Sequence, residues 1–198
     1  MKYIATFFLS LITITTIMSQ DKNTTNSLPY YEVPEYAGKY TAGTVAARMI
    51  DGLGFRYRWA TENLREEDLN YKPSEDARTT LETIDHILIL SRMIVNATLK
   101  TPIDFTKTQP KLTAEEKRKN TLNNFKTASD ILLKLTDLEE LKIQMITKGG
   151  TIEYPFWNNI NGPIADAIWH AGQIASFRRS SGNGISSKVG FLDGKIKK

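Results

Sequence analysis

The sequence predicts an all-α protein: a four-helix bundle with a short hairpin or irregular segment before its last helix. Four stretches place apolar residues three and four positions apart, the spacing of one face of an α-helix. Two of these stretches open with a Thr-x-x-Glu capping box, a pattern typical of a helix N-terminus. Strand-like patterning is confined to one short segment, so helix-on-helix packing is the expected architecture.

The first helix is predicted over residues 43–65. Its apolar face recurs about once per turn, and residues 69–76, which include Pro73, connect it to the next helix. The residues of this face are Val45, Met49, Leu53, Tyr57, Ala60 and Leu64.

The second helix is predicted to begin at the Thr79–Glu82 capping box and to reach Leu99. Apolar residues surround it on nearly all sides, which is typical of a buried helix. His86 lies within this apolar stretch, and Pro102 follows the end of the helix.

A second capping box, Thr113 with Glu116, predicts a third helix that ends near Asp137. Residues 142–146 and 151–154 then read as a short hairpin around the turn Lys148-Gly149-Gly150. Residues 138–146 are equally compatible with an extension of the third helix.

The fourth helix is predicted from an Asn161 cap, with Pro163 in its first turn, to about Ser180. The glycine-containing stretch 181–184 stops it. The connection that precedes it is too long for a simple up-down-up-down bundle.

The chain is predicted to carry a signal peptide over residues 1–20, because Lys2 precedes an apolar run that ends near Ile17. This implies a periplasmic or secreted protein with no stable membrane insertion after cleavage; an uncleaved N-terminal anchor is the alternative. Residues 21–42 are expected to form an extended arm, 43–182 the bundle and 183–198 a basic tail.

The amino-acid composition excludes several classes of site and partner. The 198 residues include no cysteine and two histidines, which excludes disulfides, thiolate metal sites and a cysteine nucleophile. The net charge of +4 is concentrated from Arg178 onward. Such a tail is either a solvated end or a contact for an anionic surface. Basic and aromatic residues do not alternate there, so no nucleic-acid partner is expected.

The residues that could carry chemistry are the two histidines and one carboxylate. Asp166 and His170 are four residues apart and share a helix face with Gln173. If the second and fourth helices are neighbours, His86 joins them, and two imidazoles with one carboxylate can hold a divalent metal. The alternatives are a core histidine at His86 and an exposed Asp166–His170 ion pair, with the two histidines well apart.

Other polar and aromatic residues are weaker candidates. Asp85 is a candidate second-layer group beside His86, and Gln173 is another. Tyr154, Trp157 and Trp169 are candidates to line a pocket. The alternative for the aromatic residues before the fourth helix is a hydrophobic plug over the end of the bundle.

Two segments carry a resemblance to a known family. Residues 69–73 (LNYKP), 79–82 (TTLE) and 84–87 (IDHI) resemble the second helix of the DinB-like superfamily, and residues 164–174 (IADAIWHAGQI) resemble its fourth. The resemblance implies an up-up-down-down four-helix bundle and a divalent metal held by three histidines. His86 and His170 match two of these ligands, and Asp166 stands where the family has the third histidine.

The resemblance implies a metal-dependent hydrolase or transferase with an unidentified small-molecule substrate. Zn²⁺ is the first choice of metal, with Ni²⁺, Fe²⁺ and Mn²⁺ as alternatives. The competing expectation is a non-catalytic bundle that binds a ligand or partner at a degenerate metal site. A homodimer is compatible with either.

Overall fold

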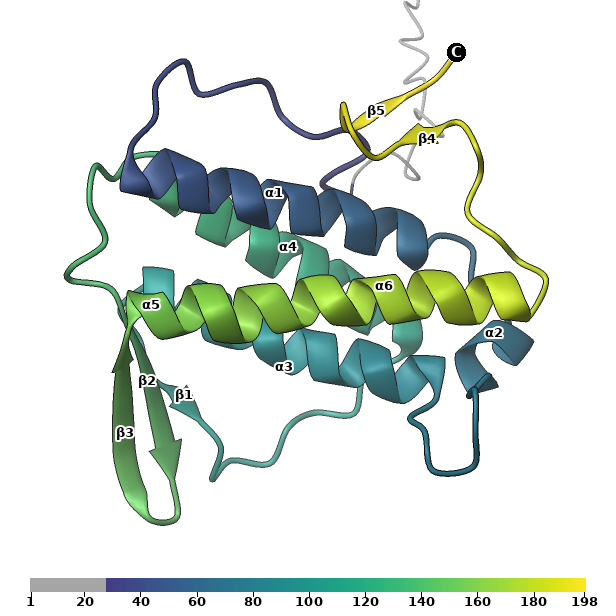
Figure 1. Ribbon diagram of the computed structural model, residues 1–198. Helices are drawn as coiled ribbons and strands as arrows, with labels where there is room; N and C mark the ends of the chain where they lie inside the picture. Colours follow the sequence, from purple (N-terminus) through teal and green to yellow (C-terminus); the bar gives the residue numbers. More distant parts are fainter. Residues whose placement is uncertain (1–27) are drawn as a thin grey trace, which may run out of the picture.

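Four long helices pack side by side around one apolar core in the computed structural model, which describes residues 28–198 (Figure 1). The protein is mainly helical, with a small sheet and a C-terminal strand pair. The predicted signal peptide and residues 21–27 of the predicted arm lie outside the described residues. The long helices are α1 (Ala42–Ala60), α3 (Thr80–Thr98), α4 (Ala114–Leu132) and α6 (Ala165–Ser180).

Helices α1 and α3 each pack against both α4 and α6. The hydroxyl of Thr41 at the start of α1 donates to the carbonyl of Leu135 beyond the end of α4, so these two helices are antiparallel. Arg178 near the end of α6 donates to the carbonyl of Trp59 near the end of α1, so that pair is parallel.

The direction order of the long helices is up-down-down-up, and the expected up-up-down-down course is wrong. Helices α3 and α4 run the same way, opposite to α1 and α6 (Figure 1). Because two consecutive parallel helices need a connection that returns along their length, residues 99–113 take that path. None of the helices in residues 28–198 is both long and apolar enough to cross a bilayer.

Both predicted capping boxes are confirmed. The Thr79 hydroxyl accepts from the amide of Glu82 at 3.1 Å, and the Glu82 carboxylate accepts from the amide of Thr79 at 2.8 Å. Thr113 and Glu116 form the same pair of bonds at the start of α4. These reciprocal bonds satisfy two backbone donors that a helix start otherwise leaves unpaired.

The first helix is shorter than predicted. It ends at Ala60, and a separate short helix, α2 (Glu66–Asn70), follows it. The Thr61 hydroxyl donates to the carbonyl of Tyr57 at 2.7 Å, and Asn63 takes a left-handed φ of 53°. The chain therefore turns away before Leu64, although the apolar spacing continues through that residue.

The predicted hairpin is confirmed as β2 (Lys142–Thr147) and β3 (Gly150–Pro155), which pair antiparallel. A two-residue strand, β1 (Ile103–Asp104), adds in parallel to β2, with Ile103 opposite Met145. Two residues are too few to produce a recognisable alternation, so the sequence gives no sign of β1.

The last helical segment begins earlier than its predicted Asn161 cap. Helix α5 (Phe156–Asn159) continues through a π-helical segment, η2 (Ile160–Ile164), into α6. Within η2, Gly162 has non-helical angles (φ −99°, ψ −105°), and the next residue is Pro163, which has no amide proton to donate. A π segment changes the rotational phase of the residues that follow it, so η2 helps to aim the polar face of α6.

The C-terminal residues fold onto the N-terminal arm and α1, so they are not a free solvated end. The strands β4 (Val189–Gly190) and β5 (Lys195–Ile196) pair antiparallel. The amide of Val33 donates to the carbonyl of Gly194 at 2.9 Å. Lys195 forms ion pairs with Glu32 and Glu35 of the arm, which compensate part of the positive charge there.

Gly43, at the start of α1, lies against the end of α4. A Cβ atom at Gly43 would lie 2.3 Å from the carbonyl oxygens of Leu132 and Leu135, far closer than van der Waals contact allows. Gly43→Ala is therefore expected to lower the free energy of unfolding by about 1–3 kcal/mol. Gly172→Ala is the control, because the same atom meets nothing within 4 Å there. It should raise stability by roughly 0.5–1 kcal/mol. Chemical denaturation measures both, and equal effects would contradict the close approach.

Candidate metal centre

His86, Asp166 and His170 converge between α3 and α6, and their ligand atoms all lie within 4.8 Å of one another. The Nε2 atom of His86 is 3.1 Å from Oδ2 of Asp166. The Nε2 atom of His170 is 3.2 Å from Oδ1 of the same carboxylate. Each oxygen of one carboxylate thus faces a different imidazole.

The helices account for this convergence. Asp166 and His170 lie one turn apart on α6, so both side chains project from the same face. Because α3 packs against α6, His86 meets that face from the neighbouring helix. The two imidazole rings lie 4.7 Å apart between centroids, at 88° to each other. The expectation of a purely structural ion pair, with the histidines well apart, does not match this geometry.

Gln173 fixes the orientation of the His170 ring. The Nδ1 atom of His170 lies 2.6 Å from the side-chain oxygen of Gln173. A carbonyl oxygen can only accept, so Nδ1 is the donor and carries a proton. In the neutral ring Nε2 then presents its lone pair to the group, as a metal-ligating histidine requires.

The donor set fits a divalent metal. In the neutral His170 ring, the Nε2 lone pair faces a carboxylate oxygen at 3.2 Å, and a cation between the two atoms removes their repulsion. Donors bound at about 2.0–2.1 Å in tetrahedral geometry lie about 3.3 Å apart. The two Asp166–histidine separations are close to this value but involve different carboxylate oxygens, and one ligand atom from each residue can be chosen so that all three lie within 4.8 Å of one another. Two imidazoles and one carboxylate also leave a fourth position open.

The group is accessible from solvent. The side chains of His86 and Asp166 are 29% and 39% exposed, whereas His170 is 14% exposed. His170 is therefore the most enclosed of the three ligand candidates. The open side is where a small molecule could reach the group.

Asp85 forms no hydrogen bond or ion pair with His86, Asp166 or His170. Its carboxylate forms an ion pair with Lys117 of α4 at 2.7 Å, on the side of α3 that faces α4. The sequence placed Asp85 next to His86 in a second layer, but adjacent residues of a helix point about 100° apart. Lys117 had no signal in the sequence that marked it as the partner.

The three aromatic candidates lie in different places. Trp169 is 71% exposed on α6, and Tyr154 is 41% exposed on β3. Trp157 lines a cavity beside α1 that shares no residue with the His86–Asp166–His170 group. Of the aromatic residues that were expected to form a hydrophobic plug over the end of the bundle, only Phe156 is buried.

Comparison with protein-family models, curated proteins and solved structures found no match to this chain. The geometry of the residues themselves is therefore the basis for a functional assignment.

Proposed function

We propose that this chain is an exported, DinB-like divalent-metal protein whose ligands are His86, Asp166 and His170. The observation that carries the proposal is the placement of both Nε2 atoms against one carboxylate, at 3.1 Å and 3.2 Å. The DinB-like four-helix assignment is part of the proposal. It is supported by the resemblance of the two helices that bear the ligands and by their packing against each other.

Zinc is the proposed metal, because imidazole and carboxylate ligands in a site with an open position are typical of catalytic zinc. Nickel, iron and manganese accept the same donors and are the alternatives. When bound, such an ion acts as a Lewis acid and lowers the pKa of a coordinated water or thiol.

The proposed reaction class is metal-dependent hydrolysis or group transfer on a small molecule. In this role Gln173 holds the His170 ring in the ligating tautomer, and Asp166 supplies the negative charge that balances the cation. Export would separate the protein from cytosolic thiols, so hydrolysis is the stronger of the two candidates.

The test is elemental analysis of the full chain after loading with zinc or nickel and removal of free metal. The expected result is about one ion per chain, the content of a single site with three protein ligands. A chain that retains no divalent ion under either condition would contradict the proposal. Activity on ester, amide and phosphoester substrates then separates the hydrolase from the transferase.

The second candidate is a non-catalytic ligand-binding or interaction protein with a degenerate metal site. It is favoured by one observation: Asp166 contacts both imidazoles without requiring a metal. It predicts that His86→Ala and His170→Ala lower only stability and leave ligand binding intact.

Gln173→Leu is expected to weaken metal affinity by about 10–100-fold while the three ligands remain. The reason is that Nδ1 of His170 loses its acceptor and the ring is no longer held in the ligating tautomer. Competition with a chromogenic zinc chelator measures the affinity. Trp169→Ala, an exposed change on the same helix, is the control and should leave it unchanged.

A further inference from the structure

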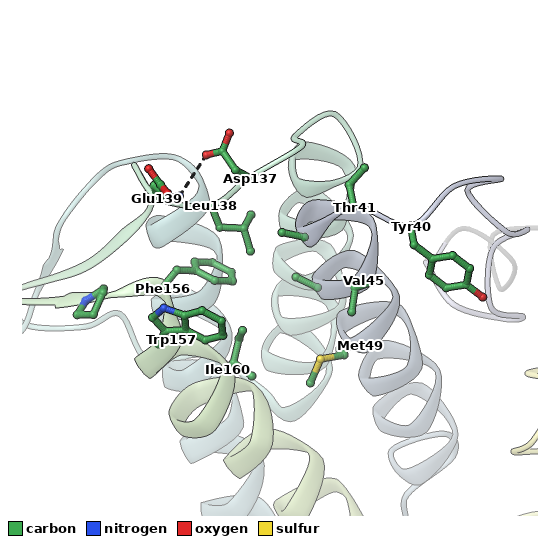
Figure 2. Close-up of a pocket in the computed structure, with 13 residues that line it drawn as sticks. Tyr40, Thr41, Val45, Met49, Asp137, Leu138, Glu139, Phe156, Trp157 and Ile160 are labelled. Carbon is green, nitrogen blue, oxygen red and sulfur yellow. Dashed lines mark hydrogen bonds between the residues drawn. The ribbon is translucent and has the colours of Figure 1, made fainter.

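A cavity of about 630 Å³ lies between the first half of α1, the loop after α4 and helix α5 (Figure 2). Figure 2 shows Phe156 and Trp157 facing Val45 and Met49 across this space. Its volume falls within the roughly 300–1,000 Å³ typical of small-molecule sites. The remaining lining residues, apart from the two at its acidic end, are Tyr40, Thr41, Ala42, Ala46, Leu138, Pro155 and Ile160.

The two charged residues that line this cavity are both acidic, although Asp137 also borders a neighbouring hollow with Lys100 and Lys134. Asp137 and Glu139 lie together at one end of the cavity (Figure 2), and none of its lining residues is basic. The amide of Glu139 donates to Asp137 at 3.3 Å. Neither carboxylate forms an ion pair within residues 28–198, whereas the neighbouring Glu140 pairs with Lys100.

Trp157 adds an aromatic surface to the same opening. Its side chain belongs to the cavity lining, yet the residue is 77% exposed. An exposed indole beside an apolar cavity is costly to solvate, and its ring face attracts organic cations. Apolar walls, an exposed indole and two carboxylates without a basic partner are together complementary to one class of ligand.

We propose that this cavity binds an amphipathic organic cation, an alkyl or aryl ammonium compound. The apolar body lies between α1 and α5, where the Trp157 ring forms part of the wall, and the ammonium group lies at Asp137 and Glu139. An anion with the same apolar body would meet two like charges there and is disfavoured. The cavity shares no residue with the His86–Asp166–His170 group, so this site does not depend on the proposed metal.

The test is isothermal titration of the full chain with three probes of equal chain length, each below its micelle concentration. Octyltrimethylammonium is expected to bind at least tenfold more tightly than octyl sulfate or octanol. Equal binding of all three would overturn the preference for a cation, and tighter binding of octyl sulfate would reverse it.

Variants locate the site. Val45→Trp fills the cavity and should abolish binding of octyltrimethylammonium. The double variant Asp137→Asn, Glu139→Gln should weaken the binding of octyltrimethylammonium about tenfold and leave the binding of octanol unchanged. Wild-type affinity in both variants, with the fold verified by circular dichroism, would overturn the proposal.

Two tryptophan variants and a histidine variant complete the design. Trp157→Ala should weaken binding of the cation, whereas Trp169→Ala, which changes another exposed tryptophan outside the cavity, should not. His170→Ala should also leave the affinity unchanged, because it alters only the proposed metal site. This result separates failure of the cavity proposal from failure of the metal proposal.

Discussion

Asp166→Ala is expected to abolish stoichiometric binding of a divalent ion, whereas Asp166→His is expected to retain it. Asp166 is the central group of the site, since its two oxygens lie 3.1 Å and 3.2 Å from the two imidazoles. Alanine leaves two neutral ligands and no negative charge to balance the cation. Histidine restores three ligands of the type that zinc accepts.

Removal of a hydrogen bond that supports a ligand weakens metal affinity by about 10–100-fold. Asp166→Ala removes a ligand itself, so its loss of metal affinity is expected to be larger. Elemental analysis and chelator competition, with wild type, both variants and Trp169→Ala measured side by side, give the comparison. If Asp166→Ala keeps the wild-type metal content, the metal does not lie at this group. If Asp166→His alone fails, the space between α3 and α6 does not accept a third imidazole.

The cluster of His86, Asp166 and His170 was largely predictable because most of its parts are local patterns. The spacing of Asp166 and His170 fixes a shared helix face, and the Gln173 position follows from the same period. The contribution of His86 required α3 and α6 to be neighbours, which spacing alone does not give. The capping boxes likewise placed the starts of α3 and α4 correctly, because a cap is made within four residues.

Features that depend on distant residues were not predictable from local pattern. The helix direction order follows from the course of the connections, and the expected order was wrong. The kink at Gly162 and Pro163 reads in sequence as a helix start, although the helix already runs from Phe156. Val45 and Met49 carry the spacing of a core face, yet they line a cavity, because the loop after α4 and α5 leave that space open.

Asp68 provides the clearest case of a residue whose role depends on distant partners. Its fully buried carboxylate accepts from the backbone and guanidinium of Arg65, at distances of 2.8–3.0 Å. It also accepts from the Ser181 hydroxyl at 2.5 Å and the Asn183 amide at 2.6 Å. One side chain therefore joins α2 to the end of α6.

Asp68→Ala is expected to lower the free energy of unfolding by about 2–4 kcal/mol, because it removes a fully buried carboxylate that accepts several hydrogen bonds from the half-exposed Arg65 and the part-buried Ser181 and Asn183. For a chain of this size the melting temperature should fall by about 5–15 °C. Glu67→Ala is the control, since Glu67 also pairs with Arg65 but is 63% exposed. That change should cost no more than about 1 kcal/mol.

The pH dependence of this effect has a definite sign. The hydrogen bonds from Arg65, then those from Ser181 and Asn183, hold the pKa of Asp68 far below its usual range in the folded protein, against the opposing effect of burial. In the unfolded chain the pKa returns to about 3.9. The ionised carboxylate therefore stabilises the fold fully above that value, and this contribution is lost as the pH falls toward the folded pKa.

The stability difference between wild type and Asp68→Ala should be constant from neutral pH to about pH 5 and shrink below about pH 4. Urea denaturation across this range measures it, and a difference that grows in acid would show that the carboxylate is not held ionised by these bonds.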